Sequence, residues 1–514
     1  MTVPRAGPLV PAGFRLLRDE GTRVLGDGTL LVGGAPVRVL RLSPVGAKLV
    51  AGWWAGEPVP SAPGARALAR RLLDAGLAQP SVAPGGAGFT ERDVTVVVPA
   101  RDRAAKLAQC LTGLGDLDPD RVVVVDDGSA DPTAVANVVS AAGVRLVRRA
   151  LNGGPGAARN TGMTLTRTPL VAFVDSDCVP RPGWLAPLLA HFADPAVGAV
   201  APRIVAHQPG RDWLSRYEAA RSPLDMGARA ANVAAGTRVP YVPTAALVVR
   251  ATAFGEGFTE ELRAGEDVDF VWRLGTAGWR VRYEPAVSVA HQHRRRLRPW
   301  FRRRMHYGTS AAVLELRHPG SVRPLYLSRW TALAWAAALA RRPSAAVAVT
   351  AVATALLARR MSCVTGERWP LPTPGGRRTA WPLAARLAAG GTVSAARPVG
   401  SAISRGWWPV VLPAAVVLRR SRVPLVALVL VPPVLDWLAD RPPLDPARYV
   451  AARLLDDLTY SLGVWRGCAR HRTVRPLIPR RRAAGAGGSA AEPTREAVGD
   501  DHVGPGKVRD GAVP

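Results

Sequence analysis

The stretch that decides the fold of this chain reads Leu170-Val171-Ala172-Phe173-Val174-Asp175-Ser176-Asp177. Its apolar run, bounded by prolines and other turn residues, predicts a buried strand of a parallel sheet. Asp175 and Asp177 then stand at the carboxyl end of that strand, where open α/β sheets bind ligands. Oxygen ligands at positions i and i+2 can share one hard divalent cation, which keeps sites open for phosphates. A single Asp-x-Asp is a weak signal, because many strands end in a solvated aspartate, so the segments upstream decide its meaning.

Two similar strand-to-loop transitions precede this stretch. Residues 94–99 run into the loop 100–103, and residues 121–125 run into Asp126-Asp127-Gly128-Ser129. Each is followed by a segment of helix length, and this alternation predicts a doubly wound, mostly parallel α/β sheet. The glycines of residues 152–162 allow the backbone to approach a ligand closely, and Arg159 can face a phosphate or a base edge. Each segment alone could be a turn or a flexible loop, but together and in this order they indicate a ligand site.

This ordered set resembles the family 2 glycosyltransferases of the GT-A fold. The matching residues are Pro99-Ala100-Arg101-Asp102, Asp126-Asp127-Gly128-Ser129, Gly156-Ala157-Ala158-Arg159-Asn160-Thr161-Gly162, Asp175-Ser176-Asp177 and Glu266-Asp267. The resemblance implies a nucleotide-sugar donor, whose uracil and ribose would be held by Pro99, Arg101, Asp126 or Asp127, and Arg159. It also implies a divalent metal cation, Mg²⁺ or Mn²⁺, which Asp175 and Asp177 would hold together with the donor diphosphate.

The chemistry of the transfer fits these residue types. A sugar diphosphate leaves with developing negative charge, which a divalent cation stabilises. Glu266-Asp267 opens an expected amphipathic helix at 268–274, and by itself a carboxylate there is best explained as a complement to the helix dipole. The resemblance instead makes Glu266 and Asp267 catalytic, with Asp267 as the general base for the acceptor hydroxyl. A base opposite the leaving group implies direct displacement with inversion at the anomeric carbon.

Three further residues are assigned by their positions. His291 follows the strand-like run 285–290 and matches a histidine that many GT-A enzymes use as a metal ligand. Beside the arginines at 294–296 it could equally be a solvated surface residue. Residues 241–250 look like the acceptor-side strand of the family, so Thr244 and Ala245 are expected to line the acceptor cleft.

Residues 10–82 follow a different pattern. Short strand signals at 14–16, 30–32 and 37–40 precede a helix that starts at Ser43-Pro44 and a second amphipathic helix at 65–77. The pattern resembles the PqqD-like, winged-helix peptide-recognition domains, and the alternative is a purely structural cap. A linker at 83–88, rich in Gly, Ala and Pro, then leads into the GT-A domain, which we expect at 93–320.

Residues 321–478 are predicted to be helical and apolar. The apolar stretches 330–340, 345–358, 407–418 and 423–438 are each shorter than the roughly 20 residues that span a bilayer, and Pro432-Pro433 should interrupt the last. Short membrane helices, interfacial helices and buried core helices all remain open. The arginine pairs that flank the stretches favour the cytoplasmic face of the inner membrane. The tail, residues 479–514, is expected to be disordered.

The formal charge of +29 and the isoelectric point near 11.5 raise the question of nucleic acid. Lysine occurs only at 48, 106 and 507, so almost all of the positive charge is arginine, which indicates a coding bias. No zinc-binding spacing or nucleic-acid motif is present, so no nucleic-acid partner is expected. Part of the charge is expected to serve the donor phosphates and an anionic inner-membrane surface. Four widely separated cysteines and no apolar leader predict free thiols in the cytoplasm.

The whole layout resembles the glycosyltransferases of the actinobacterial mycofactocin system, through Leu42-Ser43-Pro44, Leu455-Asp456-Asp457-Leu458-Thr459-Tyr460 and Gly463-Val464-Trp465. That resemblance implies transfer of glucose from UDP-glucose to a peptide-derived redox carrier, which builds a β-linked oligoglucan. One alternative is a family 2 transferase acting on a polyprenyl-linked or cell-wall saccharide. Another is a non-catalytic binding protein on a GT-A scaffold. The clustered carboxylates argue against the second alternative, because unneeded like charges around a cleft repel one another.

Overall fold

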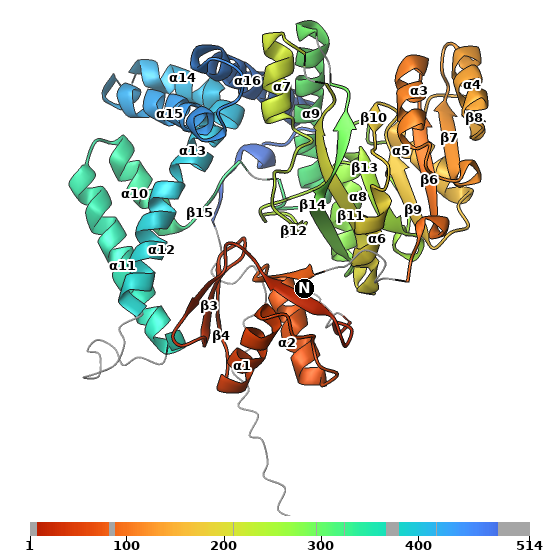
Figure 1. Ribbon diagram of the computed structural model, residues 1–514. Coiled ribbons are helices and arrows are strands. Elements are labelled where there is room, and N and C mark those ends of the chain that lie inside the picture. The colour runs from red at the N-terminus through yellow and green to blue at the C-terminus, as the bar shows by residue number, and fades with distance from the viewer. Residues whose placement is uncertain are drawn as a thin grey trace, which may run out of the picture.

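The computed structural model describes residues 8–81, 88–208, 210–293, 296–322, 324–365, 380–417 and 419–481. They form a small N-terminal unit, a central sheet with helices on both faces, and a helical C-terminal region (Figure 1). The predicted linker at 83–88 lies largely outside the described residues, and so does most of the predicted tail.

The central sheet has the strand order β10-β14-β11-β13-β9-β6-β7-β8, and β12 pairs with β14. Its strands are β6 (Val94–Ala100), β7 (Val122–Asp127), β8 (Arg145–Arg149), β9 (Leu170–Val174), β10 (Cys178–Val179), β11 (Val197–Ala206), β12 (Ala231–Asn232), β13 (Ala246–Arg250) and β14 (Arg280–His291). The half from β8 to β9 is parallel throughout. β13 then runs antiparallel to both β9 and β11, so the complete sheet is mixed.

Helices cover both faces of this sheet (Figure 1). They are α3 (Ala104–Gly113), α4 (Pro132–Ala141), α5 (Pro155–Thr164), α6 (Leu185–Leu189), α7 (Trp213–Arg221), α8 (Glu266–Thr276) and α9 (Leu297–Arg317). Val96 and Val98 of β6 point into the core under α3, whereas Val97 points into a second core that contains Ala158 of α5 and Phe270 of α8. Alternate residues of one strand therefore bury on opposite faces, as a doubly wound sheet requires. The predicted fold class is confirmed.

Two glycines begin the helices that carry Arg159 and Asp267. Gly154 precedes α5 with φ of 92°, and Gly265 precedes α8 with φ of 80°. This backbone region is costly for residues with a Cβ. The glycines thus let the chain turn sharply into each helix at the carboxyl edge of the sheet.

The N-terminal unit has its own core. It contains β1 (Arg15–Arg18), β2 (Arg23–Leu25), β3 (Leu30–Gly33), β4 (Arg38–Arg41), α1 (Pro44–Trp54), α2 (Pro63–Asp74) and β5 (Ala78–Ser81). Helix α1 starts as the sequence predicts, since the Ser43 hydroxyl accepts a hydrogen bond from the Gly46 N–H at 3.1 Å. Trp53 packs inside this unit. The N-terminal unit contacts the central domain through ion pairs, which include Arg70 with Asp194 at 2.6 Å and Arg280 with Asp74 at 2.8 Å.

The C-terminal region is helical, as predicted. Its elements are β15 (Tyr326–Leu327), α10 (Arg329–Leu339), α11 (Pro343–Thr365), α12 (Ala380–Ser394), α13 (Ala396–Ala402), η5 (Ile403–Trp407), α14 (Trp408–Val417), α15 (Arg422–Asp440), α16 (Pro446–Arg470) and β16 (Arg480–Arg481). β15 and β16 form a parallel pair, so the prediction of disorder is wrong for residues 480–481. Pairing with a distant strand gives these two residues an order that their local composition does not predict.

Two of the apolar helices are longer than predicted. Within the described residues, 343–362 of α11 and 422–440 of α15 are long and apolar enough to cross a membrane, with mean hydropathy of 1.3 and 1.7. Length and composition alone are weak support for such a span. α15 also continues through Pro432-Pro433, so the predicted interruption is wrong. Pro432 cannot bond the carbonyl of Leu428, and Gly400 of α13 lies so close to that carbonyl that a side chain there would collide with it.

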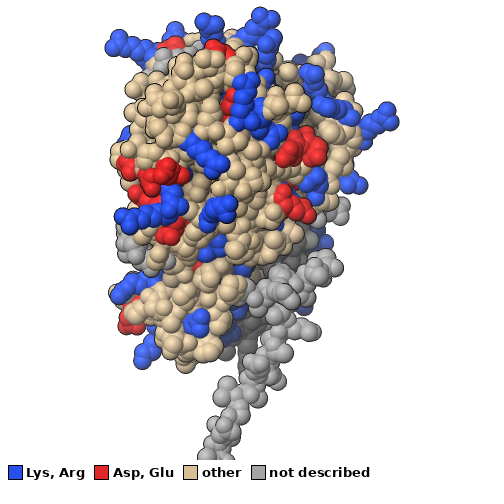
Figure 2. All heavy atoms as spheres, turned by 90° about the vertical axis from the view of Figure 1, so that its right-hand side faces the viewer, with Lys and Arg blue, Asp and Glu red and all other residues tan. Residues whose placement is uncertain are grey.

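Figure 2 shows the face of the molecule over α3 and α4. Basic and acidic side chains are interspersed across it. On this face the large positive charge of the chain is therefore spread out and partly balanced.

Candidate active site

A pocket of about 1900 Å³ lies at the carboxyl ends of β6, β7 and β9. It brings together residues that are far apart in the sequence, from Pro99 of the loop after β6 to Leu477 near the end of the C-terminal region. Of the residues predicted from the sequence, those lining it are Pro99, Arg101, Asp127, Arg159, Asp175, Asp177, Thr244, Ala245, Glu266, Asp267 and His291. Asp126 is not among the lining residues.

Asp126 instead holds two loops together. It is 1% exposed, and its Oδ1 accepts hydrogen bonds from the backbone N–H and the hydroxyl of Ser129. The Ser129 hydroxyl in turn accepts a hydrogen bond from the Asp102 N–H at 2.7 Å. Asp126 therefore fixes the loop after β7 against the loop after β6. This geometry favours Asp127 among the two alternatives for a donor contact.

Asp127 shapes the glycine-rich loop that precedes α5. Its carboxylate accepts hydrogen bonds from the N–H groups of Gly153 at 2.9 Å and Gly154 at 2.7 Å. Arg149 of β8 adds an ion pair at 2.9 Å. The loop is thus held close to the sheet edge, with Asp127 still lining the pocket.

Arg159 links the Asp-x-Asp segment to the start of α8. Its guanidinium is 2% exposed and donates to Asp175 at 2.6 Å and to Glu266 at 3.2 Å. Burial lowers the pKa of Arg159, but the charges of Asp175 and Glu266 outweigh this and hold it above the usual value. Burial raises the pKa of Asp175, and the nearby Arg159 opposes that rise. The sequence predicted Arg159 in the site but not its role as a bridge between two carboxylates.

Asp177 and His291 face each other. The two-stranded ladder of β10 and β14 pairs Cys178 with His291, which brings the imidazole Nε2 to 3.5 Å from Asp177 Oδ1. Arg103 lies 3.4 Å and Lys106 3.9 Å from the other oxygen. Burial alone would raise the pKa of Asp177, yet the surrounding positive groups hold it below its usual value, while burial lowers the pKa of His291. Both side chains therefore favour the forms that bind metal, carboxylate and neutral imidazole.

Asp267 is a carboxyl group with a strongly raised pKa. It lies in the first turn of α8, directly after Glu266. Burial and the like charge of Glu266 raise its pKa to about 7. A carboxylate poised near neutral pH is suited to accept a proton from a hydroxyl group.

Thr244 and Ala245 lie where β13 begins beside β9. Both are buried, and the carbonyl of Ala245 accepts a hydrogen bond from the Asp175 N–H at 3.0 Å. They therefore form the pocket wall next to the Asp-x-Asp segment.

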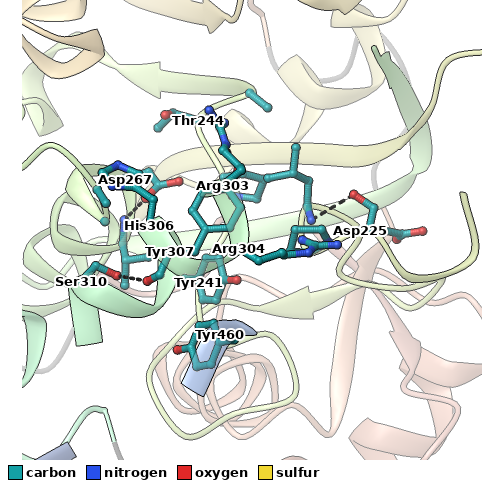
Figure 3. Close-up of a pocket in the computed structure, with 18 of the residues that line it drawn as sticks. Asp225, Tyr241, Thr244, Asp267, Arg303, Arg304, His306, Tyr307, Ser310 and Tyr460 are labelled. Carbon is teal, nitrogen blue, oxygen red and sulfur yellow. Dashed lines mark hydrogen bonds between the residues drawn. The ribbon is translucent and has the colours of Figure 1, made fainter. Parts of the chain in front are cut away.

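Several pocket residues were missed by the sequence analysis. Figure 3 shows Tyr241, Arg303, His306, Tyr307 and Tyr460 around the pocket, together with Asp267. Arg303, His306 and Tyr307 share one face of α9 at i, i+3 and i+4 spacing, a signal that the sequence contained. Tyr460 belongs to the C-terminal region, and no local pattern connects it to the central domain.

Comparisons with known proteins place this chain among glycosyltransferases. The family model described as glycosyl transferase family 2 matches residues 95–256. The pre-mycofactocin glycosyltransferase of Mycobacterium tuberculosis is 41% identical over 485 residues, which cover 91% of this chain and 98% of that protein. The succinoglycan biosynthesis protein ExoU of Rhizobium meliloti is 36% identical over 19% of this chain and 30% of its own.

The similarity of this chain to solved structures is weaker than its similarity to these sequences. The mannosyltransferase PcManGT from Pyrobaculum calidifontis, in complex with GDP-Man and Mn²⁺, has 21% identity and a TM-score of 0.35, covering 61% of this chain and 90% of that one. This score is too low to support an inference about function. The sequence relationships are sufficient: the chain belongs to the family 2 glycosyltransferases, in the same family as the pre-mycofactocin glycosyltransferase of Mycobacterium tuberculosis.

Proposed function

We propose that this glycosyltransferase transfers a hexose, glucose from UDP-glucose, to a peptide-derived small-molecule acceptor and builds a short β-linked oligoglucan. The observation that supports the transfer chemistry is that Asp267, with a pKa of about 7, lines the same pocket as the Asp175 and Asp177 carboxylates. The acceptor class rests on the similarity, over 91% of this chain, to the pre-mycofactocin glycosyltransferase of Mycobacterium tuberculosis.

The donor side is formed by the loops after β6, β7 and β9. Pro99, Arg101 and Asp127 line the pocket where the base and ribose would bind. Arg103 and Lys106 carry positive charge beside Asp177, where the diphosphate would lie. These cations offset the negative charge of both the phosphates and the Asp-x-Asp pair.

A divalent cation fits the residues beside the diphosphate position. Asp177 and His291 face each other at 3.5 Å, and oxygen and imidazole ligands suit Mn²⁺ or Mg²⁺. Among the described residues, no three His, Cys, Asp or Glu side chains form a ready-made metal cluster. Asp177 and His291 would therefore hold the ion, with Asp175 beside them and the donor phosphates completing its shell. When bound, the cation stabilises the charge that develops on the leaving diphosphate.

The acceptor side contains Asp267. Its carboxylate takes the proton from the acceptor hydroxyl, and the oxygen attacks the anomeric carbon as the diphosphate leaves from the opposite face, which inverts the configuration. Glu266 is engaged with Arg159 at 3.2 Å, so it acts by raising the pKa of Asp267 and by fixing α8. Thr244 and Ala245 line the cleft that the acceptor enters.

Two regions outside the pocket would bind a partner protein and a membrane surface. Residues 10–82 are proposed to act as a PqqD-like module for a peptide-bearing partner, supported by a core separate from that of the central domain. The apolar helices α11, α14 and α15 expose Val347, Val417 and Val423, each more than two-thirds exposed, near arginines 342, 419 and 422. Exposed apolar side chains next to arginines in the sequence suit peripheral attachment to an anionic membrane surface on its cytoplasmic side.

The decisive experiment is mass spectrometry of small-molecule extracts from cells with and without this gene. We expect hexose-bearing, peptide-derived carriers in the first and their absence in the second. Loss of lipid-linked saccharides with unchanged carriers would instead establish the polyprenyl-linked acceptor. Purified enzyme that hydrolyses no UDP-glucose with either metal would contradict the proposed donor.

A further inference from the structure

The pocket continues beyond Asp267 into a wall of tyrosines. Tyr241 comes from the loop before β13, Tyr307 from α9 and Tyr460 from α16. Figure 3 shows the three rings one after another along the pocket. Burial is the largest cause that raises the pKa of Tyr241, and the charge of Asp267 is the second. Tyr460 and Tyr307 raise this pKa further. The tyrosines therefore lie near one another and begin close to the base.

The C-terminal region is fixed firmly against the central domain at this wall. Helices α9 and α16 cross so closely that a Cβ on Gly308 would lie 2.2 Å from the Tyr460 carbonyl oxygen, and one on Gly463 would lie 2.0 Å from the Met305 carbonyl oxygen. Arg304 of α9 adds an ion pair to Asp456 at 3.0 Å. Tyr460 therefore has a defined position in the pocket, although α16 is distant in sequence.

Arg405 stabilises the Tyr460 ring from behind. It lies in η5, a single π-helical turn, a feature that is frequent at functional sites. Its guanidinium carbon lies 4.3 Å from the Tyr460 ring centroid, and its Nη1 lies 3.7 Å from Asp457. One face of the Tyr460 ring is thereby covered by a cation that is itself paired, so the pocket meets the remaining surface of the ring.

The exposed chemistry of this wall suits a sugar ring. A tyrosine offers an apolar face and a hydroxyl at its rim, and a pyranose likewise has apolar C–H faces and a rim of hydroxyls. In the part of the chain that the structure describes, the Tyr241 and Tyr460 hydroxyls make no hydrogen bond to protein, whereas the Tyr307 hydroxyl accepts one from Arg303 at 2.6 Å. The first two hydroxyls are available to a ligand.

We propose that Tyr241, Tyr307 and Tyr460, with Arg405 behind Tyr460, form a saccharide subsite on the acceptor side, which holds the sugar already attached to the acceptor. This inference rests on the proposed transfer function and extends it. A subsite for a sugar ring beside the base would place the terminal hydroxyl of a growing glycan at Asp267, so the same enzyme could add successive hexoses. Specificity for a glycosylated acceptor would then depend on the C-terminal region.

The test is a titration of the full-length enzyme with cellobiose, in the presence of saturating UDP and Mn²⁺, followed by saturation-transfer NMR. Tyr460→Ala should weaken cellobiose binding at least about tenfold, the scale for truncating an aromatic side chain that anchors a ligand. Tyr460→Phe, which keeps the ring, should weaken it less. Leu458→Ala is the matched control, because Leu458 lies on the same helix but is exposed and outside the pocket.

A parallel UDP titration separates two kinds of failure. If wild-type enzyme binds UDP but not cellobiose, or if Tyr460→Ala binds cellobiose as the wild type does, the subsite is refuted and the transferase function stands. If the wild type binds no UDP, the proposed donor is refuted. UDP affinity that is unchanged in Tyr460→Ala confirms that the variant is folded. With the natural acceptor, Tyr460→Ala should shift products toward a single hexose, and an unchanged product ladder would also overturn the proposal.

Discussion

Replacing Asp267 with asparagine tests the base directly, since the change keeps the shape of the side chain and removes its basicity. We expect transfer to fall about 10²–10⁴-fold, the usual contribution of a general base. UDP binding should stay within about twofold of wild type, because Asp267 lies on the acceptor side of the proposed site. Calorimetric UDP titration and product formation at saturating substrates measure the two effects separately.

The pKa of about 7 predicts the pH dependence of the wild-type enzyme. The base must be ionised to act, so kcat/KM at limiting donor should rise with pH and level off above 7. One unit below the pKa about a tenth of the carboxylate is ionised, so activity at pH 6 should be about a tenth of the plateau value. The Asp267→Asn variant should lack this inflection.

The same pKa predicts an effect on stability. Because the folded-state pKa of Asp267 lies above the ordinary value of 3.8, the folded protein binds the proton more tightly than the unfolded chain. Ionisation of Asp267 therefore opposes folding above pH 4, and the cost reaches its full size above pH 7. Asp267→Asn should raise the thermal midpoint at pH 8 and leave it nearly unchanged at pH 4.

The matched control is Glu261→Gln, the same chemical change at an exposed carboxylate in the segment before α8. It should change neither the pH profile nor the thermal midpoint. Two results would refute the assignment: an unchanged inflection in Asp267→Asn, or a collapse of its UDP affinity, which would make Asp267 a donor-site residue.

Three other predictions concern the metal, the N-terminal unit and the C-terminal wall. Asp177→Asn should keep its circular dichroism spectrum and lose at least about 100-fold in transfer, because the leaving diphosphate loses its cation; full wild-type activity in excess EDTA would contradict this. Arg70→Met should lower the free energy of unfolding by about 3–5 kcal/mol, because it removes the ion-pair partner of the buried Asp194 carboxylate. The side chains of Arg70 and Asp194 are only 8% and 5% exposed. A loss below about 1 kcal/mol in urea denaturation, which is typical of surface ion pairs, would refute this prediction. Gly463→Ala should lower the free energy of unfolding by about 1–3 kcal/mol through overpacking, because the added Cβ would collide with a carbonyl oxygen of α9. Gly390→Ala is the control, since a Cβ there has nothing within 4 Å. Equal thermal midpoints for these two variants would exclude the tight crossing of α9 and α16.

Local sequence was sufficient for the parallel half of the sheet and for the acidic residues at its edge of the pocket. Runs of valine that end in carboxylates determine buried strands whose polar ends meet at one edge, because parallel strands share the direction of their carboxyl ends. The sequence alone therefore predicts that Asp127, Asp175 and Asp177 lie near one another, and all three line the pocket. Helix α1 was equally local, since Ser43 and Pro44 specify its start through their own chemistry.

Only the tertiary structure decided the partners and the far wall of the site. Asp126 holds two loops together, and Arg159 bridges Asp175 and Glu266. Both roles depend on side-chain directions that the order of residues in the sequence does not reveal. Tyr460 reaches the pocket because α9 and α16, far apart in the chain, fit closely together at Gly308 and Gly463. Such contacts arise from packing of distant surfaces, whereas periodicity and capping report only the few residues that neighbour each position along the chain.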